Sequence, residues 1–184
     1  MVKKSFSDMA CSVAQAMDVI GEWWSMLIVR DFFVGGGRRR FEQLRDSLGI
    51  SRNILTERLR TLTEAGVIEK VPLQEGGRRY AYQLTDKGLD LLPVMISIMQ
   101  WWDRWEQEPE KRFMKVRVRE TGEEIAPVSV QNERGDVLGY QDLIMTVCTP
   151  RGEMKIREWP LDFRSLTDDD LLELPTEAAA KKVS

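Results

Sequence analysis

The chain contains no histidine among its 184 residues and only two cysteines, Cys11 and Cys148. The absence of histidine removes the most common general base and metal ligand, and two cysteines so far apart do not form a disulfide framework. No apolar stretch reaches 18 residues without a charge, and the N-terminus lacks the apolar block of a signal peptide. We therefore expect a cytoplasmic protein without a membrane span, a metal or a cofactor.

The composition, with 42% hydrophobic and 31% charged residues, is that of an ordinary globular protein. The net charge of −3 hides a local excess of positive charge. The segment 38–79 contains ten basic and six acidic residues, which gives it a net charge of +4. Because nucleic-acid binding depends on the local field, an acidic total charge does not exclude it.

The basic segment begins with the pattern of two short helices separated by a glycine. A helix is predicted over 41–48, Gly49 supplies a turn, and Ser51 can cap a second helix over 51–65. Gly66 ends that second helix. The predicted buried faces consist of Phe41, Leu44 and Leu48 in the first helix and of Leu55, Leu59 and Leu62 in the second.

After the second helix the hydrophobic period changes to two. Strands are predicted over 67–71 and 80–84, with a hairpin turn at Gly76-Gly77. Arg78 and Arg79 therefore lie at the tip of the hairpin. Two helices followed by a basic hairpin are the layout of a winged helix-turn-helix, which places one helix in the major groove of DNA.

Longer helices are predicted on both sides of this unit. The spacing of apolar residues over 12–33 predicts a helix with a break near Gly21, and the glycines at 35–37 end it. A single long helix is predicted over 86–107, apolar around most of its circumference and bent in the middle by Pro93. A chain of this size has too little other mass to cover such a helix. We therefore expect a second subunit to cover it in a homodimer.

The C-terminal part has a different pattern, with short alternating stretches that predict a small β-rich appendage followed by a tail. The fold class expected for the whole chain is mainly α with a small β component (α+β). We expect a winged helix DNA-binding and dimerisation domain over 1–107, and the appendage and tail over 108–184. The predicted strands are 114–118, 125–130 and 138–147, and the turns between them are 132–135 and 151–153.

From Cys11 to about Trp105 the chain resembles the HxlR family of bacterial winged-helix transcription regulators. The resemblance implies homodimers that bind inverted-repeat operators and act as repressors or activators. The matching motifs are Cys11-Ser12-Val13, Asp18-Val19-Ile20-Gly21 with Trp24, Arg39-Arg40-Phe41 with Leu44, Gly49-Ile50-Ser51, Leu55-Thr56-Glu57-Arg58-Leu59-Arg60 with Leu62, Ala65-Gly66, Tyr82-Gln83-Leu84-Thr85 and Lys87-Gly88.

The appendage also resembles a small cysteine-rich β unit that some family members carry. Thr121-Gly122, Pro127 and residues 131–135 have the spacing of that unit, but its cysteines are missing here. Because a metal site of that kind needs thiolate ligands, no metal is expected in the appendage. Its role stays open.

The exposed side of the second helix is the predicted DNA-binding surface, although an exposed helix face is polar in proteins of many functions. Arginine and asparagine can make paired hydrogen bonds with guanine and adenine. Glu57 could accept a hydrogen bond from cytosine or pair with Arg60, and we favour the pairing. We expect at least one of the three arginines before the first helix to be structural. The residues assigned to DNA are Ser51, Arg52, Asn53, Thr56 and Arg60 in the helix, Arg78 and Arg79 in the wing, and Arg38, Arg39 and Arg40 before the first helix.

Cys11 and a set of tryptophans have two interpretations each. Cys11 lies near the start of a helix, where the dipole favours the thiolate, while Asp8 opposes it. Some relatives of the HxlR family use a cysteine here as a sensor, so Cys11 is either an oxidant sensor or a small buried residue. Trp24, Trp101 and Trp102 belong either to the core and dimer interface or to a pocket for a flat apolar effector.

Together these observations predict a sequence-specific DNA-binding regulator of transcription. Its expected partners are double-stranded DNA, a second copy of the chain and a small-molecule effector, and its expected location is the cytoplasm, with the nucleoid. The alternative is a winged helix used for protein contact without DNA binding. An enzyme in the appendage is disfavoured because histidine, a glycine-rich phosphate loop and a paired-carboxylate motif are all missing there.

Overall fold

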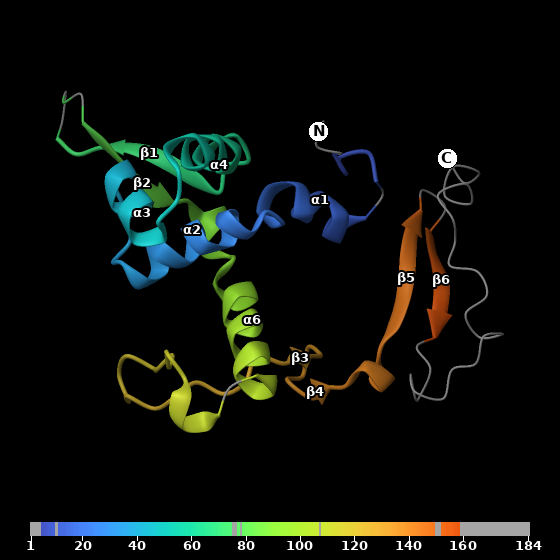
Figure 1. The fold of residues 1–184 in the computed structure, drawn as a ribbon. Coiled ribbons are helices and arrows are strands. Elements are labelled where there is room, and N and C mark those ends of the chain that lie inside the picture. The colour runs from blue at the N-terminus through green and yellow to red at the C-terminus, as the bar shows by residue number, and fades with distance from the viewer. Residues whose placement is uncertain are drawn as a thin grey trace. The chain divides into compact units, whose positions relative to one another are not determined.

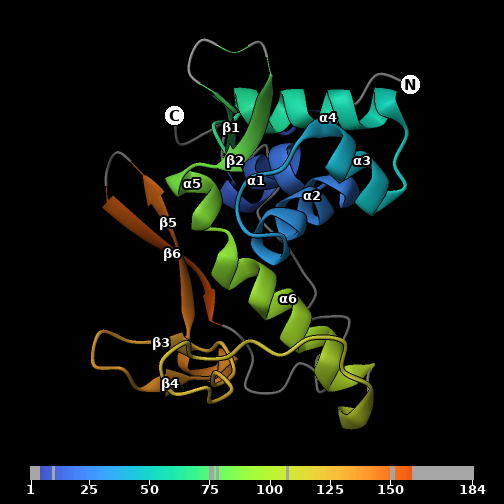
Figure 2. The same ribbon diagram turned by 90° about the vertical axis from the view of Figure 1, so that its left-hand side faces the viewer.

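The computed structural model describes residues 5–9, 11–74, 77, 79–106, 108–149 and 152–158. The chain divides into two compact units, Met1–Pro127 and Val128–Ser184. Within the described residues no helix has both the length and the hydropathy that a bilayer span requires. The first unit contains the predicted winged helix-turn-helix (Figures 1 and 2).

The N-terminal helices are α1 (Ser12–Ile20) and α2 (Trp23–Val34), with the break predicted near Gly21. A Cβ atom at Gly21 would lie 2.4 Å from the backbone oxygen of Met17, so the chain can turn this tightly only without a side chain there. Helix α2 ends as predicted before the glycines at 35–37, two of which have positive φ.

The helix-turn-helix consists of α3 (Phe41–Leu48) and α4 (Arg52–Glu64). Gly49 adopts the left-handed conformation with φ of 61°, which allows the sharp turn between the two helices. The Ser51 hydroxyl caps α4 by accepting a hydrogen bond from the backbone N–H of Ile54 at 3.4 Å. The glycine turn and the serine cap confirm the prediction from sequence.

The wing is an antiparallel hairpin of β1 (Ile68–Pro72) and β2 (Tyr80–Leu84), in which Ile68 pairs with Leu84 and Pro72 with Tyr80. Residues 73–79 connect the strands, so the loop is longer than a two-residue turn. Gly76, at which the turn was predicted, lies outside the described residues. The hairpin continues directly from the C-terminal end of α4 (Figure 1).

One hydrophobic core joins α2, α3, α4 and the wing. Burying a large aliphatic side chain contributes about 1.5–3 kcal/mol, so these contacts supply most of the driving force for folding of this unit. The predicted buried faces are confirmed, with Phe41 and Leu48 half-buried against the core. The buried cluster consists of Ile28, Val29, Phe32, Leu44, Ile50, Leu55, Leu59, Leu62, Val67, Ile68 and Tyr82.

The prediction of one long helix over 86–107 is wrong. The chain forms a short helix α5 (Asp86–Leu89) and, after a turn, α6 (Leu92–Trp105). Pro93 lies in the first turn of α6 and not in the middle of a helix. Proline has no N–H to donate, and its ring clashes with the helical carbonyl four residues earlier. In the first turn of a helix the N–H groups have no partner within the helix and that carbonyl is not part of the helix, so proline is tolerated there.

Helix α6 projects away from the packed helices of the first unit, as both ribbon views show (Figures 1 and 2). None of its residues is buried. After the short 3₁₀ helix η1 (Pro109–Lys111), the segment 112–127 returns toward α6 and is linked to it by a hydrogen bond from the Gln100 amide to the backbone oxygen of Ala126 at 3.3 Å.

The segment 112–127 folds back on itself. The Ile125 N–H donates to the oxygen of Val116 at 3.0 Å, and an isolated bridge joins Arg117 to Glu124. The prediction of a regular strand over 114–118 is therefore wrong, because the chain turns after too few residues for a ladder of strand hydrogen bonds to form.

The described residues of the second unit form two small antiparallel pairs. Strand β3 (Val130–Gln131) pairs with β4 (Val137–Leu138), and β5 (Ile144–Thr149) pairs with β6 (Gly152–Glu158). The strand predicted over 125–130 is thus reduced to its last residue. The strand predicted over 138–147 is interrupted by the 3₁₀ helix η2 (Tyr140–Asp142), which the Asp142 carboxylate caps by accepting from the N–H of Gly139. The tail beyond residue 158 lies outside the described residues.

Candidate nucleic-acid interface

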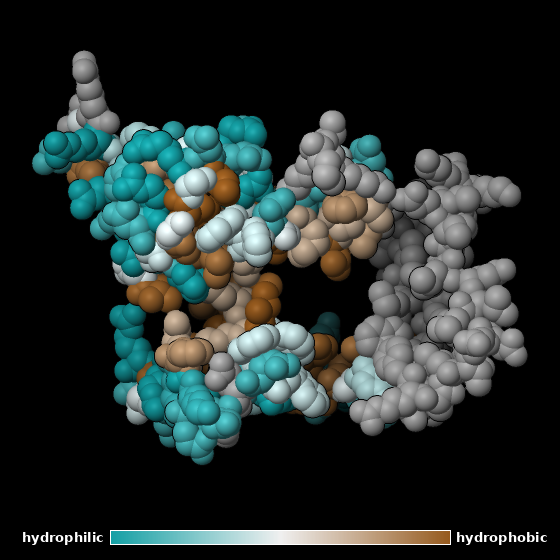
Figure 3. All heavy atoms as spheres, in the orientation of Figure 1, coloured by the Kyte–Doolittle hydropathy of each residue, from teal (hydrophilic) through white to brown (hydrophobic). Residues whose placement is uncertain are grey.

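The burial of one side of α4 determines which of its side chains face solvent. Leu55, Leu59 and Leu62 are in the core, and the opposite side is exposed. Figure 3 shows hydrophilic residues over α4 and the wing. The exposed residues of α4 that the sequence assigned to DNA are Arg52, Asn53, Thr56 and Arg60.

Arg52, the first residue of α4, is held by two neighbours from α3. Its Nη2 lies 2.9 Å from Oε1 of Glu42, and its guanidinium lies 5.2 Å from the centre of the Phe41 ring. The salt bridge and the cation–π contact restrict a side chain that is otherwise highly flexible. Glu42 was not singled out from the sequence, because its partner lies ten residues away on a different helix.

Arg60, Thr56 and Glu57 make contacts within α4. Arg60 pairs with Glu64 through Nη1, at 2.8 and 2.9 Å from the two carboxylate oxygens. The Thr56 hydroxyl donates to the backbone oxygen of Arg52 at 2.8 Å. The predicted pairing of Glu57 with Arg60 is wrong, since Glu57 instead binds the neighbouring Arg58. Arg60 reaches forward along the helix to Glu64 at the favourable spacing of four residues.

Arg58 is a residue whose burial the sequence did not reveal. Its side chain lies on the inner face of α4 and only 5% of the residue is exposed. Nη2 binds Glu57, while Nη1 is buried without a hydrogen-bond partner among the described residues. An arginine between buried leucines is difficult to predict because its long aliphatic stem can lie in either environment.

The three arginines before α3 have different surroundings. Arg39 is structural, as expected for at least one of the three: its backbone pairs with that of Tyr82, and its Nε donates to the backbone oxygen of Asp31 at 3.2 Å. Arg38 is exposed and its Nε donates to Oε1 of Gln83 at 2.9 Å. Arg40 is exposed beside the start of α3, in line with a contact to phosphate.

The wing extends the basic surface. Arg79 is exposed, and its backbone oxygen accepts a hydrogen bond from the N–H of Leu73 at 3.0 Å. Arg78 lies outside the described residues. Lys70, which was not among the DNA-binding residues predicted from the sequence, is exposed on β1. Its Nζ lies 4.7 Å from the centre of the Tyr80 ring. The wing therefore presents positive charge along its strand as well as at its tip.

Comparison with known proteins agrees with this geometry. The profile of the HxlR-like helix-turn-helix matches residues 19–110, which is half of the chain. The chain belongs to the HxlR-like family. It is therefore a transcription regulator with a helix-turn-helix DNA-binding domain, in a family of regulators and not of enzymes.

Individual members of the family are similar over most of their length. An uncharacterized HTH-type transcriptional regulator of Mycobacterium tuberculosis, Rv3095, is 40% identical over 116 residues, which are 63% of this chain and 72% of that protein. A regulator of Synechocystis, sll1512, is 37% identical over 100 residues, covering 53% and 73%. The crystal structure of PA1607, described as a candidate transcription factor, has a TM-score of 0.68 at 39% identity and covers 76% of this chain and 96% of that chain.

The residues considered for sensing lie in separate places in this HxlR-like chain. Cys11 is exposed and directly precedes α1, so it is not a buried residue of the single chain. Trp24 packs against the core and its ring lies 6.0 Å from that of Trp23. Trp101 and Trp102 are exposed on α6, with ring centres 6.4 Å apart. A role for these tryptophans in effector binding stays a prediction.

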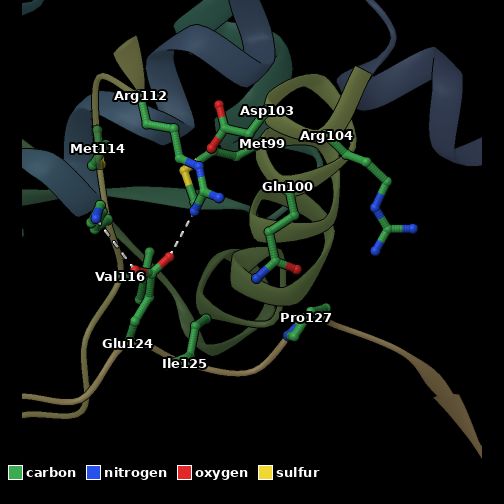
Figure 4. Close-up of a pocket in the computed structure, with 11 residues that line it drawn as sticks. Met99, Gln100, Asp103, Arg104, Arg112, Met114, Val116, Glu124, Ile125 and Pro127 are labelled. Atoms are coloured by element: carbon green, nitrogen blue, oxygen red, sulfur yellow. Dashed lines mark hydrogen bonds and ion pairs between the residues drawn. The ribbon is translucent and has the colours of Figure 1, made fainter. Parts of the chain in front are cut away.

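A pocket of about 550 Å³ lies between α6 and the segment 112–127 (Figure 4). Gln100 points into it, Arg112 binds Glu124 at 3.0 Å, and Arg104 points away from that pair. Its wall is therefore mixed, with an ion pair at one side and apolar residues such as Ile125 at another. None of the three tryptophans proposed for an effector lines this pocket.

Proposed function

We propose that this regulator binds double-stranded DNA in a sequence-specific manner, as a homodimer on an inverted-repeat operator. The observation that supports the proposal most directly is the exposed polar side of α4 beside a basic wing, both attached to one core. A helix anchored by leucines on one side can enter the major groove with the other. We place the protein in the cytoplasm, at the nucleoid, because the DNA that it would bind lies there.

The proposed contacts divide into base reading and backbone binding. Arg52 and Asn53 are suited to base edges because both can make paired hydrogen bonds, and Thr56 and Arg60 follow along the same exposed side. The free N–H groups at the start of α4, with Ser51, are suited to a phosphate. The residues proposed for the phosphate backbone or the minor groove are Arg38 and Arg40 before α3 and Arg78 and Arg79 in the wing, while Arg39 is left to its structural role.

Homodimerisation is supported by the helices that bury none of their own residues, α1 and α6. Figure 3 shows hydrophobic residues gathered over both. An exposed apolar surface of this kind is typical of an interface. The exposed large apolar side chains of the two helices are Val13, Met17, Leu92, Val94, Ile98, Trp101, Trp102 and Trp105.

A two-fold dimer presents two copies of α4, and the half-sites of its operator are expected about one helical turn, or roughly 10 bp, apart. The test is selection of duplexes from a random pool by the full-length protein, followed by mobility shifts. We expect an enriched inverted repeat whose affinity falls steeply with salt. Arg52→Ala and Arg60→Ala are expected to weaken operator binding about tenfold each, because each removes one contact of roughly 1–3 kcal/mol.

Failure to enrich any sequence at low salt would favour the alternative, a winged helix that contacts another protein. The exposed Lys70 of the wing argues against that alternative, because protein interfaces are depleted in lysine. Selection without symmetry in the enriched sequence would instead retain DNA binding and reject the two-fold dimer. Both outcomes are read from the same selection.

Response to an oxidant or a small effector is a further part of the proposal. Its support is the exposure of Cys11 directly before α1, a helix assigned to the dimer interface. Peroxide is expected to lower operator binding by the natural protein and to leave Cys11→Ser unaffected. Equal loss of binding in both proteins would reject Cys11 as the sensor.

We also propose that DNA binding and dimerisation require only residues 1–107, with 108–184 as an accessory part. The core, α4, the wing and α6 all lie within the shorter range. A chain that ends after residue 107 is expected to select the same operator as the full chain. Selection of a different sequence would assign part of the specificity to the appendage.

A further inference from the structure

Glu42, on α3, connects the two helices of the helix-turn-helix through arginines. Its Oε1 lies 2.9 Å from Nη2 of Arg52 on α4, and its Oε2 lies 2.6 Å from Nη1 of Arg45 on α3. All of these charges lie on the surface, and Arg52 and Glu42 are each more than half exposed. A carboxylate thus stands beside the first arginine of the helix that is directed at DNA.

The geometry leaves Arg52 able to read a base. A guanidinium has five N–H groups, and the salt bridge to Glu42 uses one of them. The Phe41 ring lies against the guanidinium at 5.2 Å from its centre, so the plane of the group is supported from α3 as well. A pair of N–H donors remains for the two acceptors of guanine in the major groove.

The same arrangement weakens binding to phosphate. A phosphate bound by the free N–H pair of Arg52 would lie near the Glu42 carboxylate, which carries a like charge and repels it. A guanine edge does not meet this repulsion, because it carries no net charge. The Glu42–Arg52 pair therefore disfavours contacts with phosphate, which every DNA sequence offers. It does not disfavour the contact with guanine, which depends on the sequence.

We propose that Glu42 is a specificity-determining positioning residue, which holds Arg52 for a base edge and reduces binding to unrelated DNA. The inference rests on the proposed DNA-binding function of α4. The proposed effect of Glu42 on DNA binding differs from an effect of net charge, since it depends on the contact between Glu42 and Arg52. A carboxylate elsewhere on α3 should not have this effect.

Asp46 provides the matched control. It is an exposed acidic residue of the same helix, and it binds Arg45 at 2.9 Å. Among the described contacts Asp46 has none with Arg52. Glu42→Gln and Asp46→Asn therefore remove the same charge from the same helix, and only the first releases Arg52.

The experiment compares the natural protein, Glu42→Gln and Asp46→Asn on two duplexes. One is the operator that the natural protein selects from a random pool, and the other is a scrambled duplex of the same composition. For Glu42→Gln we expect about 3- to 10-fold tighter binding to the scrambled duplex, and a salt dependence steeper by about one phosphate contact. The ratio of operator to scrambled affinity is expected to fall by roughly fivefold or more. For Asp46→Asn both duplexes should shift equally and the ratio should stay the same.

A double variant shows whether Glu42 acts through Arg52. In an Arg52→Ala background, Glu42→Gln should no longer change the affinity ratio, because the residue that Glu42 positions is absent. Thermal unfolding of each variant verifies that the fold is retained. An equal change in the ratio for Glu42→Gln and Asp46→Asn would overturn the inference, and so would an undiminished effect of Glu42→Gln without Arg52. If the natural protein itself shows no preference for the operator, the proposed function fails first.

Discussion

Helices α2, α3 and α4 place their apolar faces in the core of the chain, whereas α1 and α6 have apolar faces and bury no residue at all. Helices α1 and α6 are more apolar in composition than α3 and α4, and α1 directly precedes α2 along the chain. The difference is that the first group finds its packing partners within 70 residues of the same chain. The second group is left with an apolar surface that the described part of the chain does not cover, which is the physical basis for the proposed dimer.

The largest expected effect is the difference in folding stability between a buried and an exposed leucine. Leu44 of α3 is completely buried, whereas Leu89, the last residue of α5, is 50% exposed. Leu44→Ala is expected to lower the free energy of unfolding by about 2–5 kcal/mol, because it removes buried methyl groups and leaves a cavity. Leu89→Ala should cost less than about 1 kcal/mol. Urea unfolding at one fixed protein concentration measures both, and equal losses would contradict the comparison.

The second prediction concerns assembly. Ile98 on α6 is 52% exposed, and Leu73 in the wing is 41% exposed. Ile98→Asp is expected to raise the dimer dissociation constant by roughly 30-fold or more, equivalent to about 2 kcal/mol, because a charge would be buried without a partner. Leu73→Asp should leave the constant unchanged. Sedimentation equilibrium reports both values, and a dimer that tolerates Ile98→Asp would remove α6 from the interface.

A smaller effect is expected at the start of α4. The Ser51 hydroxyl satisfies one of the free N–H groups of the first turn. Ser51→Ala should lower the free energy of unfolding by about 1 kcal/mol, while Ser51→Gly should cost only a few tenths of that. If the alanine and glycine variants are equally stable in urea, the cap does not contribute as the geometry indicates.

The smallest effect belongs to the exposed pair of Arg60 and Glu64, four residues apart on α4. Glu64→Gln is expected to reduce stability by about 0.3–0.5 kcal/mol at low salt. The difference should disappear in 1 M salt, where charges are screened within about 3 Å. Persistence of the full difference at high salt would assign it to something other than the ion pair.

The helix-turn-helix could be predicted from the sequence because its signals are local. Gly49 needs a positive φ, Ser51 caps the next turn, and the leucines of α4 recur at helical spacing. Each of these is decided by the residue and its near neighbours. The winged-helix architecture and the HxlR-like family followed from them.

Other features could not be predicted because they depend on distant residues. The pairing of Glu42 with Arg52 joins two helices, and the burial of Arg58 depends on what packs against α4. Glu57 was expected to bind Arg60, but the choice among nearby arginines depends on side-chain directions that spacing alone does not specify. In the appendage, short alternating stretches predicted longer strands than form, because a strand also needs a partner in register.

In the winged helix-turn-helix, the order of helices and strands, the turn at Gly49, the cap at Ser51 and the sides of α3 and α4 that face the core were determined by the sequence itself, since backbone preferences and hydrophobic spacing act over a few residues. The tertiary structure alone decided that Arg39 serves the fold and that Arg52 contacts Phe41 and Glu42. These outcomes depend on which surfaces meet after folding. Contacts between residues distant along the chain are settled by packing and electrostatics in three dimensions.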